Sequence, residues 1–116
     1  MIWLAAGRST TAGRPALAGN EAGSFVLGWV HTPAGSANPT EIRVQHGAVG
    51  SGVVSLGPVR LLESVTTGGH VEGIALARST VKRSSGGWQE TRAVWSRWYT
   101  TPAPGDFDVR TASFRI

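Results

Sequence analysis

The sequence predicts an all-β protein, a small antiparallel β-sandwich or β-barrel with an extended N-terminal arm. Two observations carry this prediction. Short blocks rich in Val, Ile, Thr and aromatic residues follow one another, and in several of them apolar and polar residues alternate as in half-buried strands. Turn-forming segments rich in Gly and Pro separate the blocks at the spacing typical of sandwiches and barrels. These segments are residues 33–39, 47–52, 57–58, 68–69, 84–87 and 102–105.

The blocks have the length of strands, and one of them also admits a helix. Residues 71–83 carry Glu72 early and Lys82 late, with a glycine pair after them as a stop signal. A strand is preferred, because Gly73 and the β-branched residues near position 80 weaken a helix. The predicted strands cover residues 25–31, 41–45, 52–56, 59–66, 70–83, 88–100 and 107–116.

Two of these blocks predict a β-hairpin around the Ser- and Gly-rich segment 84–87. With all four residues in the loop, Leu76 lies opposite Trp95 and Gly73 lies opposite Trp98. An aromatic ring over a cross-strand glycine is a favourable arrangement in a sheet. We therefore expect this register.

The predicted hairpin presents two kinds of surface. Because successive side chains of a strand point to opposite faces, Trp98 and Val94 share one face, while Trp95 and Tyr99 share the other. Both faces at the base of the hairpin need cover, and a thin domain covers only one of them. Near the loop the hairpin is cationic, with Arg78, Lys82, Arg83 and Arg92.

The first 24 residues are predicted as an extended arm, and residues 25–116 as a single β domain. In residues 5–24, 14 of the 20 side chains belong to Ala, Gly, Ser or Thr, and Leu17 is the only large apolar one. Such a segment buries too little apolar surface to offset its own ordering entropy. We therefore expect the arm to need a contact outside itself.

The tip of the arm supplies an anchor. Met1, Ile2, Trp3 and Leu4 are apolar and can fill a pocket or add a strand to the sheet of another subunit. Twenty extended residues reach roughly 65 Å, whereas a core of this size measures about 30 to 35 Å across. We expect the arm to grip a neighbouring subunit, with wrapping along its own domain as the alternative.

The C-terminal block changes the phase of its apolar residues. Phe107 and Val109 alternate in one phase, whereas Ala112 and Phe114 alternate in the other. A β-bulge near Thr111 accounts for such a switch. The block is predicted to close a sheet, since a final strand with no polar tail is typically tied into one.

Charge is sparse and lies mainly in the C-terminal third. The net charge is +4, and from Arg78 onward seven basic residues stand against three acidic ones. Five basic residues on one hairpin are few for a nucleic-acid protein, so we expect no nucleic-acid partner. The chain has no cysteine, and no apolar run approaches the roughly 20 residues of a membrane span, so we expect a soluble protein with no membrane contact.

The residues that carry chemistry indicate no catalytic, cofactor or metal site. His31, His46 and His70 lack the spacing of metal ligands, although His70 and Glu72 share a strand face. The glycine-rich segment 47–52 lacks the Lys-Ser/Thr of a phosphate loop and leads into a strand, so it is interpreted as a turn. We therefore predict a protein that is not an enzyme.

The Trp- and Arg-rich hairpin has three possible uses. Aromatic and basic side chains together can stack single-stranded nucleic-acid bases, and Trp faces can pack on sugar rings. The third use, core packing and subunit contact, is preferred, because Trp is most often a nearly buried packing residue. A binding module for carbohydrate or single-stranded nucleic acid is kept as the alternative function.

A cysteine-free, Gly- and Ala-rich β domain with an arm at residues 1–24 and a closing strand at 106–116 resembles the small structural proteins of tailed-bacteriophage particles. These are the capsid decoration (cement) and head-to-tail completion proteins. The resemblance implies a homo-oligomer that is made in the host cytoplasm, is located in the virion, clamps neighbouring capsid or tail subunits, and performs no catalysis. The residues expected to contact partners are Met1, Ile2, Trp3, Leu4, Leu17, Arg78, Lys82, Arg83, Arg92, Trp95, Trp98 and Tyr99.

Overall fold

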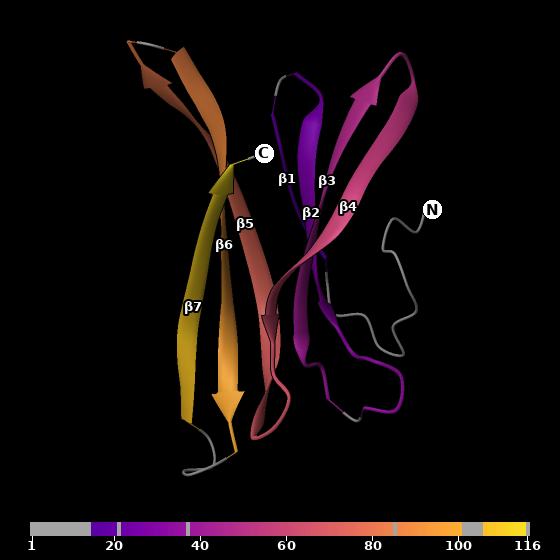
Figure 1. Cartoon of the computed structure of the whole chain (residues 1–116), viewed down its shortest axis with the longest axis vertical. Coiled ribbons are helices and arrows are strands. Elements are labelled where there is room, and N and C mark those ends of the chain that lie inside the picture. The colour runs from indigo at the N-terminus through magenta and orange to yellow at the C-terminus, as the bar shows by residue number, and fades with distance from the viewer. Residues whose placement is uncertain (1–14, 21, 37, 85, 101–105, 116) are drawn as a thin grey trace.

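Two antiparallel sheets form the fold, which confirms the predicted all-β class. The computed structural model describes residues 15–20, 22–36, 38–84, 86–100 and 106–115, and in these residues the chain forms strands and no helix. Sheet A has the order β1-β2-β3-β4 and sheet B the order β5-β6-β7, and neither sheet closes into a barrel (Figure 1). The strands are β1 (Ala16–Gly19), β2 (Ser24–His31), β3 (Glu41–Gly50), β4 (Val53–Ser64), β5 (Gly69–Arg83), β6 (Gly86–Tyr99) and β7 (Asp106–Arg115).

The core lies between the two sheets, where alternating side chains of both meet. Gly28 of β2 is a point of close approach, because a Cβ there would lie 2.8 Å from Cδ1 of Ile74 on β5. Burying each large apolar side chain stabilises the fold by about 1.5 to 3 kcal/mol. The buried apolar residues of this core are Val26, Val30, Ile42, Val44, Val65, Val71, Ala93, Trp95 and Phe114.

The hairpin of β3 and β4 is longer than predicted. The turn expected over residues 47–52 is confined to Ser51 and Gly52, and β3 continues to Gly50. Both turn residues are left-handed, with φ of 52° and 78°. This is the conformation of the two-residue turns that suit the twist of a hairpin, so a short turn leaves the neighbouring glycines free to pair.

The turn predicted at Gly57 and Pro58 is also wrong, because β4 runs through both residues. A register shift of the β3–β4 ladder, between Gln45 and Gly47, falls opposite them. Proline has no N–H to donate to a ladder and is tolerated at bulges and on edge strands. β4 is one of the two edge strands of sheet A, so Pro58 marks a bulge rather than the end of a strand.

The hairpin of β5 and β6 has its predicted faces but not its predicted register. Its connection has two residues rather than four, so Leu76 lies opposite Ala93 and Trp98 lies opposite His70. Gly87 permits the longer pairing, because a Cβ there would collide with the carbonyl oxygen of Val81. From Ile74 onward the error is two residues, which preserves the side-chain alternation, and a register shift between Glu72 and Ile74 makes it three residues nearer the base. The helical alternative for 71–83 is wrong, since this segment is strand.

β7 pairs with β6 along its whole length, so the bulge predicted near Thr111 is wrong. The ladder runs without a register shift from Glu90 opposite Arg115 to Tyr99 opposite Asp106. The apolar residues change phase because they serve different faces of an unbroken strand. Phe107 and Val109 at its start are exposed on the face away from sheet A, whereas Phe114 at its end points into the core.

Part of the segment predicted as an arm is a strand of sheet A. β1 pairs with the first residues of β2, from Ala16 opposite Gly28 to Gly19 opposite Phe25. For these four residues, the alternative prediction that the arm wraps along its own domain is therefore the one that fits. The expected anchor, Met1 to Leu4, lies outside the described residues.

Candidate protein interaction surface

The outer face of sheet B, which points away from sheet A, exposes several large apolar side chains. Since Ala93 and Trp95 of β6 point into the core, alternation turns Val94 and Trp98 outward. The unbroken register of β7 places Phe107 and Val109 on the same side. We call Val94, Trp98, Phe107 and Val109 the outer patch; the exposed fractions of Val94, Phe107 and Val109 are 38%, 55% and 69%.

Aromatic rings form a row across the outer patch. The ring of Trp98 stacks on that of His70 at a centroid distance of 6.2 Å and contacts Phe107 at 5.0 Å. Nε2 of His70 lies 3.0 Å from Oε1 of Glu72, which confirms that these two residues share a face. The row therefore shields both sides of the Trp98 ring with side chains of this chain, while Phe107 at the edge strand remains half exposed.

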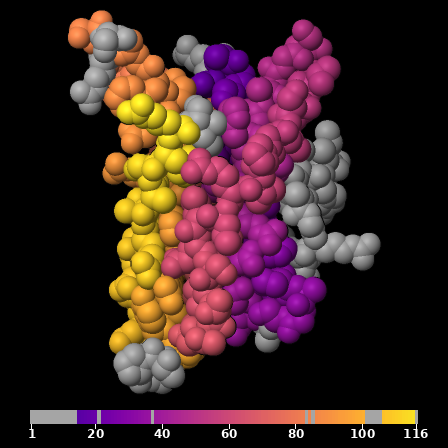
Figure 2. Space-filling model, in the orientation of Figure 1, coloured from indigo at the N-terminus to yellow at the C-terminus, as the bar shows by residue number. Residues whose placement is uncertain are grey.

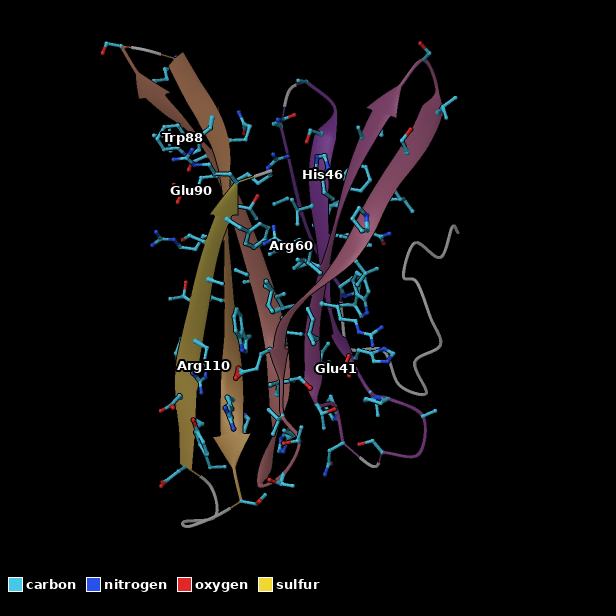
Figure 3. The ribbon with its side chains drawn as sticks, viewed as in Figure 1. Glu41, His46, Arg60, Trp88, Glu90 and Arg110 are labelled. Atoms are coloured by element: carbon cyan, nitrogen blue, oxygen red, sulfur yellow. The ribbon has the colours of Figure 1, made fainter. Side chains whose placement is uncertain are left out.

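Nearer the hairpin tip the outer face is polar and basic. Arg115 places its guanidinium 3.7 Å from the centroid of the Trp88 ring, and Nε of Arg92 donates to Oγ of Ser113 at 3.1 Å. Trp88 and Glu90 lie on this upper part of sheet B (Figure 3). A cation over an aromatic ring contributes about 0.5 to 1 kcal/mol at an exposed site. Arg115 and Arg92 therefore both have partners within the chain.

The inner face of sheet B is closed by a polar cluster around Glu63 of β4. Nε1 of Trp95 donates to Oε1 of Glu63 at 2.6 Å, and Nη1 of Arg97 lies 3.2 Å from the other carboxylate oxygen. Nε of Arg110 lies 3.3 Å from that same oxygen. The Glu63 side chain is only 10% exposed. One carboxylate thus joins sheet A to two arginines and a tryptophan of sheet B.

Tyr99 belongs to this inner side as well. Its hydroxyl donates to Oδ2 of Asp108 at 2.7 Å, and the guanidinium of Arg97 lies 4.9 Å from its ring centroid. Arg60, also on β4, covers the ring of Phe114 at 5.1 Å. These contacts show that the inner face is committed to the fold.

A second polar contact joins the sheets near their diverging ends. Oγ of Ser24 lies 2.9 Å from Nε2 of His46, and Nη1 of Arg78 donates to the same oxygen at 2.9 Å. Burial, and then the charge of Arg78, lower the pKa of His46. The neutral ring can accept the Ser24 hydroxyl proton, but among the described residues no carboxylate contacts its other nitrogen. A catalytic base needs such an orienting group, so we interpret the contact as structural.

The hairpin of β3 and β4 also exposes apolar side chains. It diverges from the β5–β6 hairpin at one end of the molecule (Figure 1). Val49, Val53, Val54 and Leu56 near its turn are 49%, 61%, 44% and 42% exposed. We call these four residues the hairpin patch.

The residues predicted to contact partners are divided between the two sides of the molecule. Leu17 on edge strand β1 is 67% exposed, and Trp98 lies on the outer face. Trp95 is 5% exposed and bonded to Glu63, so it is unavailable to a partner in this structure. Arg78 and Tyr99 lie on the inner side, Lys82 and Arg92 are exposed, and the side chain of Arg83 is not described.

The prediction missed the two most exposed members of the outer patch, Phe107 and Val109. Their signal was present in the alternation of the C-terminal block, where it was interpreted as a bulge. The hairpin patch was missed because its valines flank glycines that predicted a turn.

Comparison with known proteins finds no matching family model, no similar curated protein and no similar solved structure. Within the described part of the chain, no group of His, Asp and Glu side chains could hold a metal ion. The same residues contain no helix long and apolar enough to cross a membrane.

Proposed function

We propose that this chain is a non-enzymatic structural subunit of a larger, virion-like assembly, in which it binds and clamps neighbouring subunits. The observation that carries the proposal is the outer patch. Its exposed side chains lie side by side on one sheet face, whereas exposed apolar residues of a monomer are usually scattered. Contiguous apolar surface of this kind marks protein contacts.

The shape of the molecule supports the same role. The radius of gyration is 15.6 Å, compared with about 13 Å expected for a compact chain of this length. A thin molecule exposes more surface for its mass than a compact one. Covering the outer patch and the hairpin patch with neighbouring subunits would remove that surface from water.

The alternative, binding of carbohydrate or single-stranded nucleic acid, needs aromatic faces that a ligand can reach. The described tryptophans offer few such faces. Trp29 and Trp95 are buried, Trp98 is flanked by His70 and Phe107, and Trp88 lies under Arg115. This arrangement favours a structural role.

Sedimentation of a lysate from cells that encode the chain tests the proposal. We expect the full chain to sediment with large particles, and a double variant of the outer patch, Phe107→Ser with Val109→Ser, to remain in the slow fraction. The matched control is Thr111→Ser with Ser113→Thr on the same face of β7, which should sediment as the wild type does. A wild-type chain found only in the slow fraction would contradict the proposal.

A further inference from the structure

The outer edge of β7 has no partner strand in the described structure. Sheet B ends at β7, and the order β5-β6-β7 leaves one side of its ten-residue backbone unpaired. Figure 2 shows the side chains of β7, in yellow, along one side of the molecule. The β4 edge of sheet A differs, because β4 carries Pro58 beside a register shift, and both features discourage pairing.

We propose that two copies of this chain pair β7 with β7, antiparallel, about a two-fold axis at Val109. The inference rests on the proposed function and names one of its partners, a second copy. The two three-stranded sheets would become one continuous sheet, since an exposed edge pairs readily with an added strand. Such a contact is isologous, with the same residues contributed by both copies.

The charges of β7 select the register. A two-fold axis perpendicular to the sheet keeps each face on its own side, so the axis passes through a residue. With Val109 on the axis, Asp108 of each copy lies opposite Arg110 of the other, and Phe107 lies opposite Thr111. Opposite charges directly across a ladder are favourable. Val109, the most exposed member of the outer patch, then meets its own copy.

Neighbouring registers lack this complementarity. An axis at Asp108 sets two carboxylates against each other, and an axis at Arg110 does the same with two guanidinium groups. Like charges directly opposite are destabilising. An axis at Thr111 places Asp108 opposite Phe114 and Arg110 opposite Ala112, so neither charge gains a partner. The Asp108 register does place Arg110 opposite Asp106, but it keeps the two Asp108 carboxylates face to face. Of these four, the Val109 register is the one that forms charge pairs without setting like charges opposite each other.

The Val109 register also joins the two outer patches. Phe107 and Val109 of both copies lie on the same face of the continuous sheet, next to Val94 and Trp98 of each. The combined apolar surface is about twice that of one chain. It remains available to another subunit of the assembly, so the pairing adds a contact without consuming the surface that carries the proposed function.

Disulfide trapping tests the register, because the chain has no cysteine of its own. In Val109→Cys the two sulfurs face each other across the axis, at a Cα separation of about 4.5 to 5.5 Å that a disulfide accepts. The control is Thr111→Cys on the same face of the same strand, where the two cysteines lie about 13 Å apart along the ladder. We expect at least ~10-fold more covalent dimer from Val109→Cys under mild oxidation.

Charge complementation provides a second test. Asp108→Lys alone and Arg110→Glu alone each oppose like charges in a homodimer, so both chains should stay at the 12.1 kDa of a monomer. Mixing them restores two opposite-charge pairs and should give twice that mass in light scattering. Because Arg110 also contacts Glu63 and Asp108 accepts the Tyr99 hydroxyl, thermal unfolding first checks that both variant chains are folded; if either is not, the cysteine pair decides.

Each outcome bears on the inference. Preferential trapping of Val109→Cys, or a dimer formed only by the mixture, supports it. Equal or preferential trapping of Thr111→Cys overturns it, as does a wild-type chain that remains monomeric at high micromolar concentration with neither cysteine trapped. A monomeric chain that still sediments with large particles would overturn the β7 pairing and leave the proposed function standing.

Discussion

The two faces of sheet B are made from the same strands, but one is buried against sheet A and the other is exposed. Its inner face packs on sheet A and ties Trp95, Arg97 and Arg110 to Glu63. Its outer face leaves Phe107 and Val109 more than half exposed. A strand with apolar side chains on both faces can thus pack one face in the core and leave the other face available to a partner. Substitutions on the two faces should therefore affect different properties.

The largest loss of stability is expected from Trp95→Ala. This change removes a buried ring and the donor to Glu63, and should lower the free energy of unfolding by about 4 kcal/mol. Trp98→Ala on the outer face is the matched control and should cost no more than about 1.5 kcal/mol, the size of aromatic contacts. Urea unfolding measures both. Equal losses would show that the two faces are not distinguished in this way.

Glu63→Gln should have the next largest effect. It leaves the guanidinium groups of Arg97 and Arg110 without their carboxylate in a largely buried site, at a cost of about 3 kcal/mol. Glu72→Gln removes the exposed contact with His70 and should change the free energy of unfolding by less than about 0.5 kcal/mol. If the Glu63 variant is as stable as the Glu72 variant, the cluster does not brace the sheets.

The stability should fall when the pH is lowered below the ordinary histidine pKa of 6.5. The folded pKa of His46 is lowered by burial and then by Arg78, so the unfolded chain takes up protons first as the pH falls. The loss continues until the pH reaches the lowered value, where both states are protonated. His46→Gln should reduce the slope of melting temperature against pH between pH 7 and 5.

Part of the slope that remains in the His46→Gln chain is expected from His31. Its pKa is also lowered, chiefly by burial and then by Arg43, with Glu41 acting in the opposite direction. The double variant His31→Gln with His46→Gln should have the smallest slope. An unchanged slope in both variants would contradict the assignment.

A small effect on stability is expected from the two exposed residues of the outer patch on β7. Phe107→Ser with Val109→Ser should change the free energy of unfolding by no more than about 1.5 kcal/mol, because both side chains are more than half exposed and only the contact of Phe107 with the Trp98 ring is lost. The same change should abolish sedimentation with large particles. A loss of several kcal/mol would place these residues in the fold instead.

Side-chain alternation made the faces of the long hairpin predictable. Trp98 and Val94 are separated from Trp95 and Tyr99 by alternation along β6 itself, so these faces were right although the loop length and the register were wrong. The limits of the strands were less predictable. Gly57 and Pro58 predict the end of a strand from the sequence, but in the structure they form a bulge within edge strand β4.

The contacts between the sheets could not be predicted from spacing. Glu63 contacts Trp95 and Arg97, which lie more than 30 positions later in the sequence. Arg78 and Ser24 are 54 positions apart. Such pairs depend on how two sheets are laid on each other, which local patterns do not determine. The exposed phase of Phe107 and Val109 was visible in the sequence, but its meaning required the unbroken β6–β7 ladder.

Cysteine reactivity on the outer face tests the central claim most directly. The Val109→Cys chain is treated with a maleimide, once as the isolated chain at low concentration and once in the particle fraction of the lysate, with Thr66→Cys in an exposed loop as the control. We predict that position 109 reacts in the isolated chain and is protected at least ~10-fold in the particles, while position 66 reacts in both. Equal labelling of position 109 in the two samples would contradict the claim that a partner covers the outer face.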